Sequence, residues 1–310
     1  MSLPKALPPK SPRSSNARKT RAKMDIGVLL EKWAAKTRRA DFIPDDPLSF
    51  PHRFSDDQVA CEVAAVFAAF FAYGARPQIR HCLDGLLMKR MGGDPKGFIL
   101  QGDDAADKVA MAGFVYRFNR SGDVEFILKR LRWIFQRYGT LENLMKESIY
   151  CILGSGNLLD SSFMTESKIY QAILTEFISR FLKEGLPPSQ WYQVEKRSML
   201  FLIPRPNKGG ACKRLNLLLR WLVRTDSDLA DPVDLGLWAQ TIAPCHLRMP
   251  LDFHVSAVAR ELGLIQRASD DWKAVEELTN ALKEWDAVDP VRFDFALFGL
   301  GLSSKLVDND

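Results

Sequence analysis

Apolar residues spaced as on one face of a helix are the feature that most constrains this chain. Residues 123–138, for example, place apolar side chains at positions 124, 127, 128, 131, 134 and 135. No two strand-like segments are joined by an Asn-Gly or Asp-Gly turn, and strands do not alternate with helices. The expected fold class is therefore all-α, with helices over 25–38, 58–74, 78–91, 108–119, 123–138, 140–148, 168–183, 189–202, 211–224, 252–263 and 269–285, a short helix near 233–240 and a last helix from 290.

Composition narrows the class of protein. The 310 residues are 46% hydrophobic and 26% charged, which is ordinary for a soluble protein. No apolar run approaches the roughly 18 residues of a membrane-spanning helix, so we expect no membrane partner. The five cysteines include no CxxC pair, which argues against a disulfide framework and a zinc ribbon. We therefore expect a cytoplasmic protein.

The excess positive charge lies in one segment. Residues 1–23 hold seven Lys and Arg and no acid, so within the net charge of +5 the remaining chain contributes −2. The segment is also rich in Pro and Ser, which predicts a disordered basic tail ahead of a single domain over 24–310. The tail is either a solvated extension or a non-specific phosphate-binding arm.

The stretch "GGACKRLNLLLRW" (209–221) places cations at the start of an apolar helix. Helix N-termini carry partial positive charge and favour anions, so Lys213 is unexpected there. Glycines before a helix expose backbone N–H groups that can hold a phosphate. The alternative is a solvated basic stripe. The candidate nucleic-acid-binding residues are Lys208, Gly209, Gly210, Arg214, Arg220 and Arg224.

A second motif follows in "PLDFHV", where Asp252 is the expected N-cap of a helix. A hairpin within 189–224, a lysine on its second helix and this later aspartate together resemble the helix-hairpin-helix DNA glycosylase superfamily. "FVYRF" and "YGTLENLM" resemble the middle segment of that superfamily. More closely, over residues 27–306, the chain resembles an uncharacterised bacterial family known as a domain of unknown function, through phrases such as "FPHRF", "VDLGLW" and "DPVRFDFALFGLG".

The resemblance implies two helical lobes flanking a cleft, a monomer, and double-stranded DNA as the partner of a nucleoid-associated protein. It carries Lys213 over as the nucleophile and Asp252 as the catalytic carboxylate. Their separation of 39 positions makes the layout most similar to that of the archaeal 8-oxoguanine glycosylases, although the usual hairpin "LPGxGxxTA" is absent. No cysteine follows Cys245, so no iron–sulfur cluster is expected, and we expect no other cofactor.

The chemistry follows from the two residue types. Burial at an apolar helix start and the helix dipole both favour the neutral amine of Lys213, which can attack a sugar carbon. A carboxylate can stabilise the positive charge that develops on the sugar. Candidate pocket residues are Trp238, Phe253 and His254. With Cys245 and His246, His254 makes too few ligands for a metal site, so none is expected.

Three functions remain open. The pair predicts a DNA N-glycosylase with AP lyase activity that acts on a damaged base. A non-catalytic helix-hairpin-helix protein that only binds nucleic acid is the alternative, since it would need the hairpin but not Asp252. A protein-interaction scaffold is the third.

Overall fold

A computed structural model describes residues 25–36, 40–155, 157–159, 167–225 and 233–307. The expected disordered tail, residues 1–23, lies outside the described residues and stays a prediction. Within the described ranges the regular structure is helical, apart from one two-stranded hairpin and two isolated bridges. The all-α class is therefore confirmed for this part of the chain, and none of its helices is long and apolar enough to span a membrane.

Helix α3 (Gln58–Phe70) lies at the centre of the core. It follows a helix at residues 25–36, the short 3-10 helix η1 (Ala40–Asp45) and α2 (Ser49–His52). Asp57 caps α3, because its carboxylate accepts the N–H of Ala60 at 3.0 Å. Every α3 residue from Ala60 to Phe70 is buried, which explains why this run of the sequence is apolar on all sides apart from Glu62.

The next segment departs from the expected helices. Helix α4 (Arg76–Leu83) passes into a π-helical turn, η2 (Asp84–Arg90), and α5 (Pro95–Gln101) and α6 (Asp104–Met111) follow. The helix expected over 108–119 is wrong beyond Met111. There the chain forms a hairpin of β1 (Val115–Tyr116) and β2 (Asn119–Arg120), whose turn puts Arg117 at φ 49°.

Three longer helices complete this half of the molecule: α7 (Ser121–Tyr138), α8 (Leu141–Leu153) and α9 (Ser167–Lys183). The fully buried Glu62 of α3 accepts the backbone N–H groups of Leu141 and Glu142 at 2.6 and 3.0 Å, at the start of α8. Its carboxylate also accepts the indole N–H of Trp238 at 2.9 Å. One buried side chain therefore joins three segments that are distant in sequence.

The expected helix over 189–202 is broken in two. A 3-10 helix, η4 (Pro188–Gln193), precedes α10 (Arg197–Leu202), and η5 (Pro206–Lys208) leads to α11 (Lys213–Val223). The expected helix near 233–240 is a series of turns. The chain ends in η6 (Pro244–His246), α12 (Phe253–Glu261), α13 (Trp272–Leu282), η7 (Pro290–Phe293) and α14 (Asp294–Val307).

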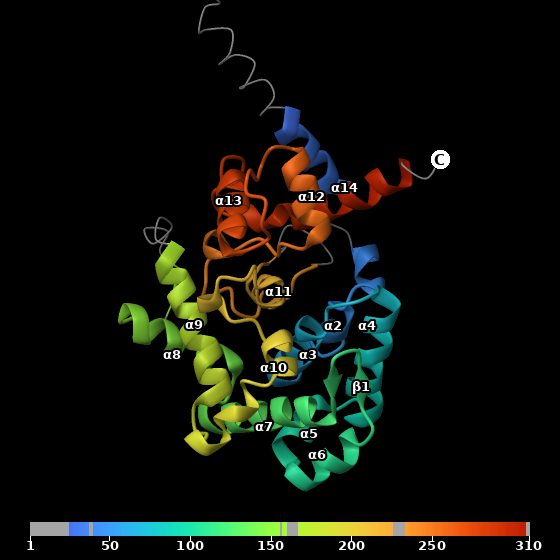
Figure 1. The fold of residues 1–310 in the computed structure, drawn as a ribbon, viewed down its shortest axis with the longest axis vertical. Coiled ribbons are helices and arrows are strands. Elements are labelled where there is room, and N and C mark those ends of the chain that lie inside the picture. Colours follow the sequence, from blue (N-terminus) through green and yellow to red (C-terminus); the bar gives the residue numbers. More distant parts are fainter. Residues whose placement is uncertain (1–24, 37–39, 156, 160–166, 226–232, 308–310) are drawn as a thin grey trace, which may run out of the picture.

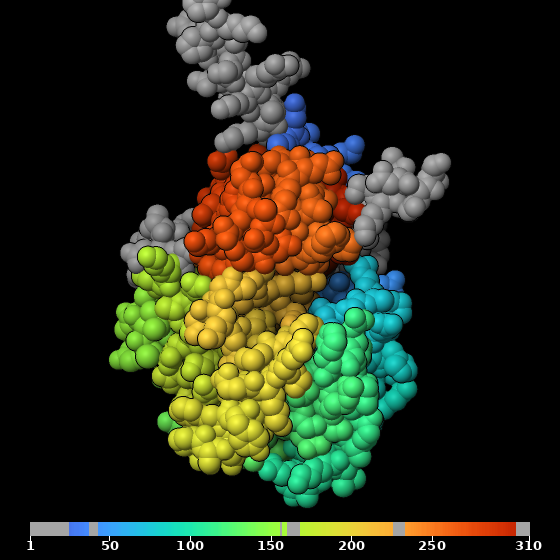
Figure 2. Space-filling model, in the orientation of Figure 1, coloured from blue at the N-terminus to red at the C-terminus, as the bar shows by residue number. Residues whose placement is uncertain are grey.

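Helix α11 occupies the middle of the molecule. It packs on α3, whereas α12 packs on α14. Figure 1 shows α12, α13 and α14 together with the helix at 25–36 at one end, and α5, α6 and α7 at the other, with α11 between them. The space-filling view in Figure 2 shows the same order of segments on the surface. This arrangement places the first turn of α11 next to the start of α12.

Candidate active site

Lys213 and Asp252 meet where two helices begin. Lys213 is the first residue of α11, and Asp252 is the N-cap of α12. The Lys213 Nζ lies 2.9 Å from Asp252 Oδ2, with 34% and 19% of the two side chains exposed. The structure thus brings together the two residues that the sequence pairs, over a separation of 39 positions.

The two oxygens of Asp252 have different partners. Oδ1 accepts the backbone N–H groups of His254 and Val255, each at 2.9 Å, while Oδ2 contacts Lys213. Burial acts to raise the pKa of this carboxyl, but the Lys213 charge and the N–H groups of α12 outweigh burial and hold the pKa below its ordinary value. Asp252 is therefore an anion at neutral pH, held in one orientation.

The residue before Lys213 has an unusual backbone. Cys212 adopts φ 51° and ψ 33°, the left-handed conformation, and is the N-cap of α11 without a side-chain hydrogen bond. A non-glycine residue in this region costs on the order of 1 kcal/mol or more, and such positions concentrate at functional sites. This strained backbone conformation occurs at the residue immediately before Lys213.

A cavity of about 400 Å³ lies beside the pair. Its size is within the range of small-molecule sites. Its wall is formed by the residues just before α2, the segment from the end of α3 into α4, one face of α11 from Lys213 to Trp221, and the starts of α12 and α14. The aromatic part of the wall consists of Tyr73, Trp221, Phe295 and Phe298. A planar apolar ligand can therefore contact ring surfaces while the Lys213–Asp252 pair reaches its edge.

Two further carboxyl groups line the cavity. Burial raises the pKa of Asp294 to about 6 against the attraction of Arg220. The negative charge of the nearby Asp252 makes a smaller contribution to this rise. Burial also raises the pKa of Asp46, whose Oδ1 accepts the N–H of Leu48 at 3.0 Å. The cavity thus combines one ionised carboxylate with two carboxyl groups that are harder to ionise.

Cations face the same space. The Arg76 guanidinium lies 4.7 Å from the ring centre of Phe298, and that of Arg220 lies 4.2 Å from the ring centre of Phe295. Both arginines line the cavity with Lys213. The cavity wall therefore carries both acidic and basic side chains, and guanidinium groups cover part of its aromatic rings.

The family model described as "Protein of unknown function (DUF2400)" matches residues 46–303. The chain belongs to this family. The DUF2400 match begins at Asp46 and extends past Asp294, so it includes every charged residue that lines the cavity. No curated protein and no solved structure matches the chain.

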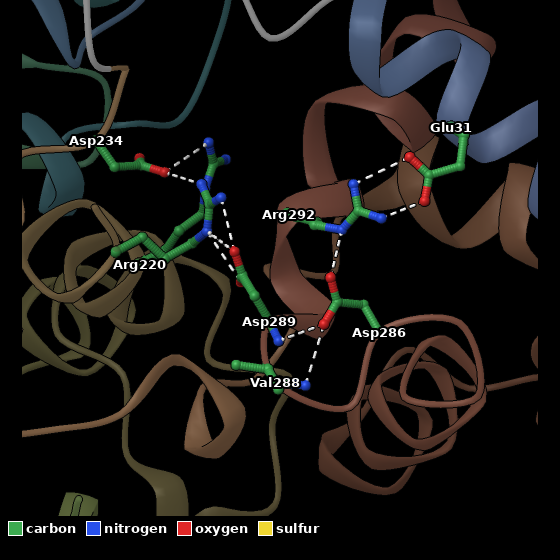
Figure 3. Close-up of polar contacts among 8 residues, drawn as sticks. Glu31, Arg220, Asp234, Asp286, Val288, Asp289 and Arg292 are labelled. Atoms are coloured by element: carbon green, nitrogen blue, oxygen red, sulfur yellow. Dashed lines mark hydrogen bonds and ion pairs between the residues drawn. The ribbon is translucent and has the colours of Figure 1, made fainter. Parts of the chain in front are cut away.

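Two of the predicted phosphate-binding residues of this DUF2400 chain are buried instead. Arg220 is 2% exposed and contacts Asp234 and Asp294. Arg224 is 2% exposed and contacts Asp234 and, at 2.8 Å, Asp289. Figure 3 shows the part of this group that contains Arg220, Asp234 and Asp289. Protein carboxylates therefore neutralise both arginines away from solvent, and a role for them in binding nucleic acid stays a prediction.

The hairpin residues lie apart from the cavity. Lys208 is exposed at the end of η5, and Gly209 turns the chain with φ 77°. The Gly209 carbonyl accepts the N–H of Trp272 at 2.8 Å, which fixes the loop to the start of α13. Gly210 is exposed and bridges to Asp271. Binding of phosphate by Lys208, Gly209 and Gly210 stays a prediction.

Arg214 is held by the protein itself. One of its terminal nitrogens donates to the Phe70 carbonyl at 3.1 Å, and another donates to the carbonyl of Phe201. Burial lowers the pKa of the guanidinium to about 10. Its plane also lies over the rings of Tyr73 and Phe201, at 5.3 and 4.7 Å. The side chain thus fixes an aromatic group next to the cavity.

The three predicted pocket residues lie in three different environments. His254 lines the cavity. Trp238 is fully buried in the core, where it donates to Glu62, and it is outside the cavity wall. Phe253 is 73% exposed and also outside that wall. Among the described residues, no group of three His, Cys, Asp or Glu side chains is placed to hold a metal ion.

Sequence reasoning missed Asp46 and Asp294 as members of the site. Both stand just before or at the start of a helical segment, in "PDDPLSF" and "RFDFALF", where an aspartate is normally an N-cap. The signal available was an acid inside a strongly apolar stretch, which needs a buried partner. That signal identifies Asp294, but it does not say that the partner is Arg220.

Proposed function

We propose that this protein is a DNA N-glycosylase with associated AP lyase activity, with Lys213 as the nucleophile and Asp252 as the stabilising carboxylate. The observation that carries the proposal is the 2.9 Å contact between these two side chains at the edge of a 400 Å³ cavity with aromatic walls. A helix-hairpin-helix glycosylase architecture is part of the proposal, with α10 and α11 as the helices of the hairpin.

The cavity supports the first step, in which a damaged base leaves the duplex stack. Extruding a base costs a few kcal/mol, and stacking on side chains offsets that cost. Trp221 and Phe298 belong to the cavity wall together with residues 72–76. The cavity volume of about 400 Å³ accommodates a purine together with part of its sugar.

The pair supports the second step. The amine of Lys213 forms a bond to C1′ of the sugar, and the N-glycosidic bond breaks with its electron pair moving to the base. The base takes up the proton that the amine loses. Asp252, held as an anion by α12, stabilises the positive charge on the sugar during this exchange. Opening of the sugar ring then moves an electron pair to O4′ and leaves an iminium ion between Lys213 and C1′.

Borohydride trapping tests this proposal. The protein starting at Met24 is incubated with duplexes that contain oxidised purines, oxidised pyrimidines or an abasic site, with borohydride present to reduce the iminium ion. We expect a stable protein–DNA adduct on at least one duplex, and Lys213→Gln should abolish it. Asp252→Asn should slow base release by about 100-fold or more while binding changes little, because it removes charge stabilisation specific to the transition state.

Lys273→Gln is the matched control, because Lys273 is an exposed lysine that lies outside the cavity wall and outside the predicted phosphate-binding hairpin. It should leave the adduct intact. An adduct that survives Lys213→Gln would assign the chemistry to another lysine. Binding of DNA without an adduct or base release on any duplex would instead support the non-catalytic helix-hairpin-helix protein.

A further inference from the structure

Two aromatic side chains stand out of the surface on neighbouring elements. Phe118, in the turn of the β1–β2 hairpin, is 61% exposed, and Phe201 of α10 is 38% exposed. Their ring centres lie 5.1 Å apart with the planes at 72°. Figure 1 shows α10 beside the hairpin, and the two elements are in contact. The two rings therefore form one exposed aromatic pair, Phe118–Phe201.

The hairpin that presents Phe118 is firmly anchored. The next residue, Asn119, is fully buried, and its Nδ2 donates to Asp123 Oδ2 at 2.9 Å. The Tyr73 hydroxyl donates to Asn119 Oδ1, and Ser198 at the start of α10 donates to Asp123 Oδ1 at 2.7 Å. The exposure of Phe118 is thus a fixed feature of the surface, since buried hydrogen bonds hold the residue that follows it.

The two chain segments that present the aromatic pair carry charges of one sign. Residues 114–120 contain Arg117 and Arg120 and no acid, and residues 196–201 contain Lys196 and Arg197 and no acid. The Arg117 guanidinium lies 6.0 Å from the ring centre of Phe118. Exposed aromatic rings among cations are the surface that single-stranded nucleic acid recognises, because bases stack on the rings while phosphates contact the cations.

The aromatic pair continues into the cavity. The Phe201 and Tyr73 ring centres are 5.0 Å apart, and Tyr73 lines the cavity together with Lys213. Arg214 lies over both rings and holds them in place. An unpaired base on the aromatic pair would therefore lie next to the space that the proposed function assigns to the extruded base.

We propose that Phe118 and Phe201 stack an unpaired base of DNA at the entrance to the cavity. The inference rests on the proposed function only for the choice of DNA as the nucleic acid. The stacking itself requires no chemistry at Lys213. The protein should therefore prefer duplexes that contain an unpaired base over fully paired duplexes of the same sequence.

The test uses a duplex with a single bulged 2-aminopurine and its fully paired counterpart. We expect the full-length protein to bind the bulged duplex more tightly and to quench 2-aminopurine fluorescence. Phe118→Ala and Phe201→Ala should each weaken binding to the bulged duplex by about tenfold, with the paired duplex affected less than about twofold. Phe118→Trp should retain the quenching, because the indole also stacks.

Phe253→Ala is the matched control, since Phe253 is a more exposed phenylalanine, at 73%, outside the aromatic pair. It should change neither affinity nor quenching. Equal affinity of Phe118→Ala and wild type for the bulged duplex would overturn the inference, as would equal losses on both duplexes. Borohydride trapping is independent of this result. If an adduct forms but no stacking is detected, the proposed function stands and this inference fails. If stacking is detected but no adduct forms, this inference stands and the proposed function fails.

Discussion

Helix α11 begins and ends with ion pairs of opposite character. At its start, the Lys213–Asp252 pair keeps 34% and 19% of its side chains exposed and faces a cavity. At its end, Arg224 and Asp234 are 2% and 0% exposed. The first pair can exchange partners with a ligand. In the second, each charge depends on the other because both are out of water, so the pair holds the fold together.

Removing the buried ion pair at the end of α11 should produce the largest loss of stability. Arg224→Met removes a partner from both Asp234 and Asp289 and should lower the free energy of unfolding by about 3–5 kcal/mol, measured by urea titration. Arg260→Met is the control, because Arg260 pairs with Asp270 at side-chain exposures of 30% and 37%, and it should cost less than about 1 kcal/mol. Equal losses in the two variants would contradict the distinction between buried and exposed pairs.

The second expected effect is a pH dependence of the free energy of unfolding, caused by a carboxyl group in the cavity wall. Burial raises the pKa of Asp294 from 3.8 to about 6, so the folded protein holds a proton that the unfolded chain releases. Stability contributed by this group is therefore full below pH 4 and falls as pH rises to 6, by on the order of 2 kcal/mol.

The stability of Asp294→Asn, measured by urea titration at pH 4 and pH 6, gives the reference. The wild type should lose stability relative to this variant over that interval. Asp252 should show no such fall, because its pKa lies below the ordinary value and its contribution is lost only as pH drops into the acid range. A difference between wild type and variant that is constant with pH would contradict the assignment for Asp294.

The smallest stability effect is expected at the exposed end. Lys213→Met should change the free energy of unfolding by about 1 kcal/mol or less, because Asp252 keeps both N–H groups of α12 and water can replace the ammonium. Thermal and urea unfolding of Lys213→Met and Arg224→Met side by side measure the contrast. A loss in Lys213→Met as large as in Arg224→Met would make the first pair a structural one as well.

The sequence predicted local features well where one residue determines them. Asp252 caps the helix that it was expected to begin, as Asp57 and Thr140 cap α3 and α8. A cap needs only a short polar side chain and the next few N–H groups, so its cause lies within four residues. The meeting of Lys213 and Asp252 came from a resemblance, since no local rule joins residues in two separate helices.

The basic stripe of α11 shows where such prediction fails. Helical spacing correctly places Lys213, Arg220 and Arg224 near one face, but it says nothing about what covers that face. The carboxylates that pair with the two arginines come from positions 234, 289 and 294, between 10 and 74 residues along the chain from the arginine that each contacts. The β1–β2 hairpin was missed for a different reason: its turn uses Arg117 at positive φ, where Asn-Gly would have been the usual signal.

Glu62 has a consequence for the order in which the molecule assembles. Its carboxylate joins the start of α8 and the indole of Trp238, so residues 80 and 176 positions apart must meet before this buried acid has its partners. Contacts of such long sequence separation form late and slow folding, because the intervening chain must first be brought together. Until these partners are in place the Glu62 carboxyl stays hydrated. Burial of α3, the centre of the core, is delayed because Glu62 lies on this helix. The protection of the Leu141 amide against hydrogen exchange should therefore report on completion of the whole fold rather than on helix α8 alone.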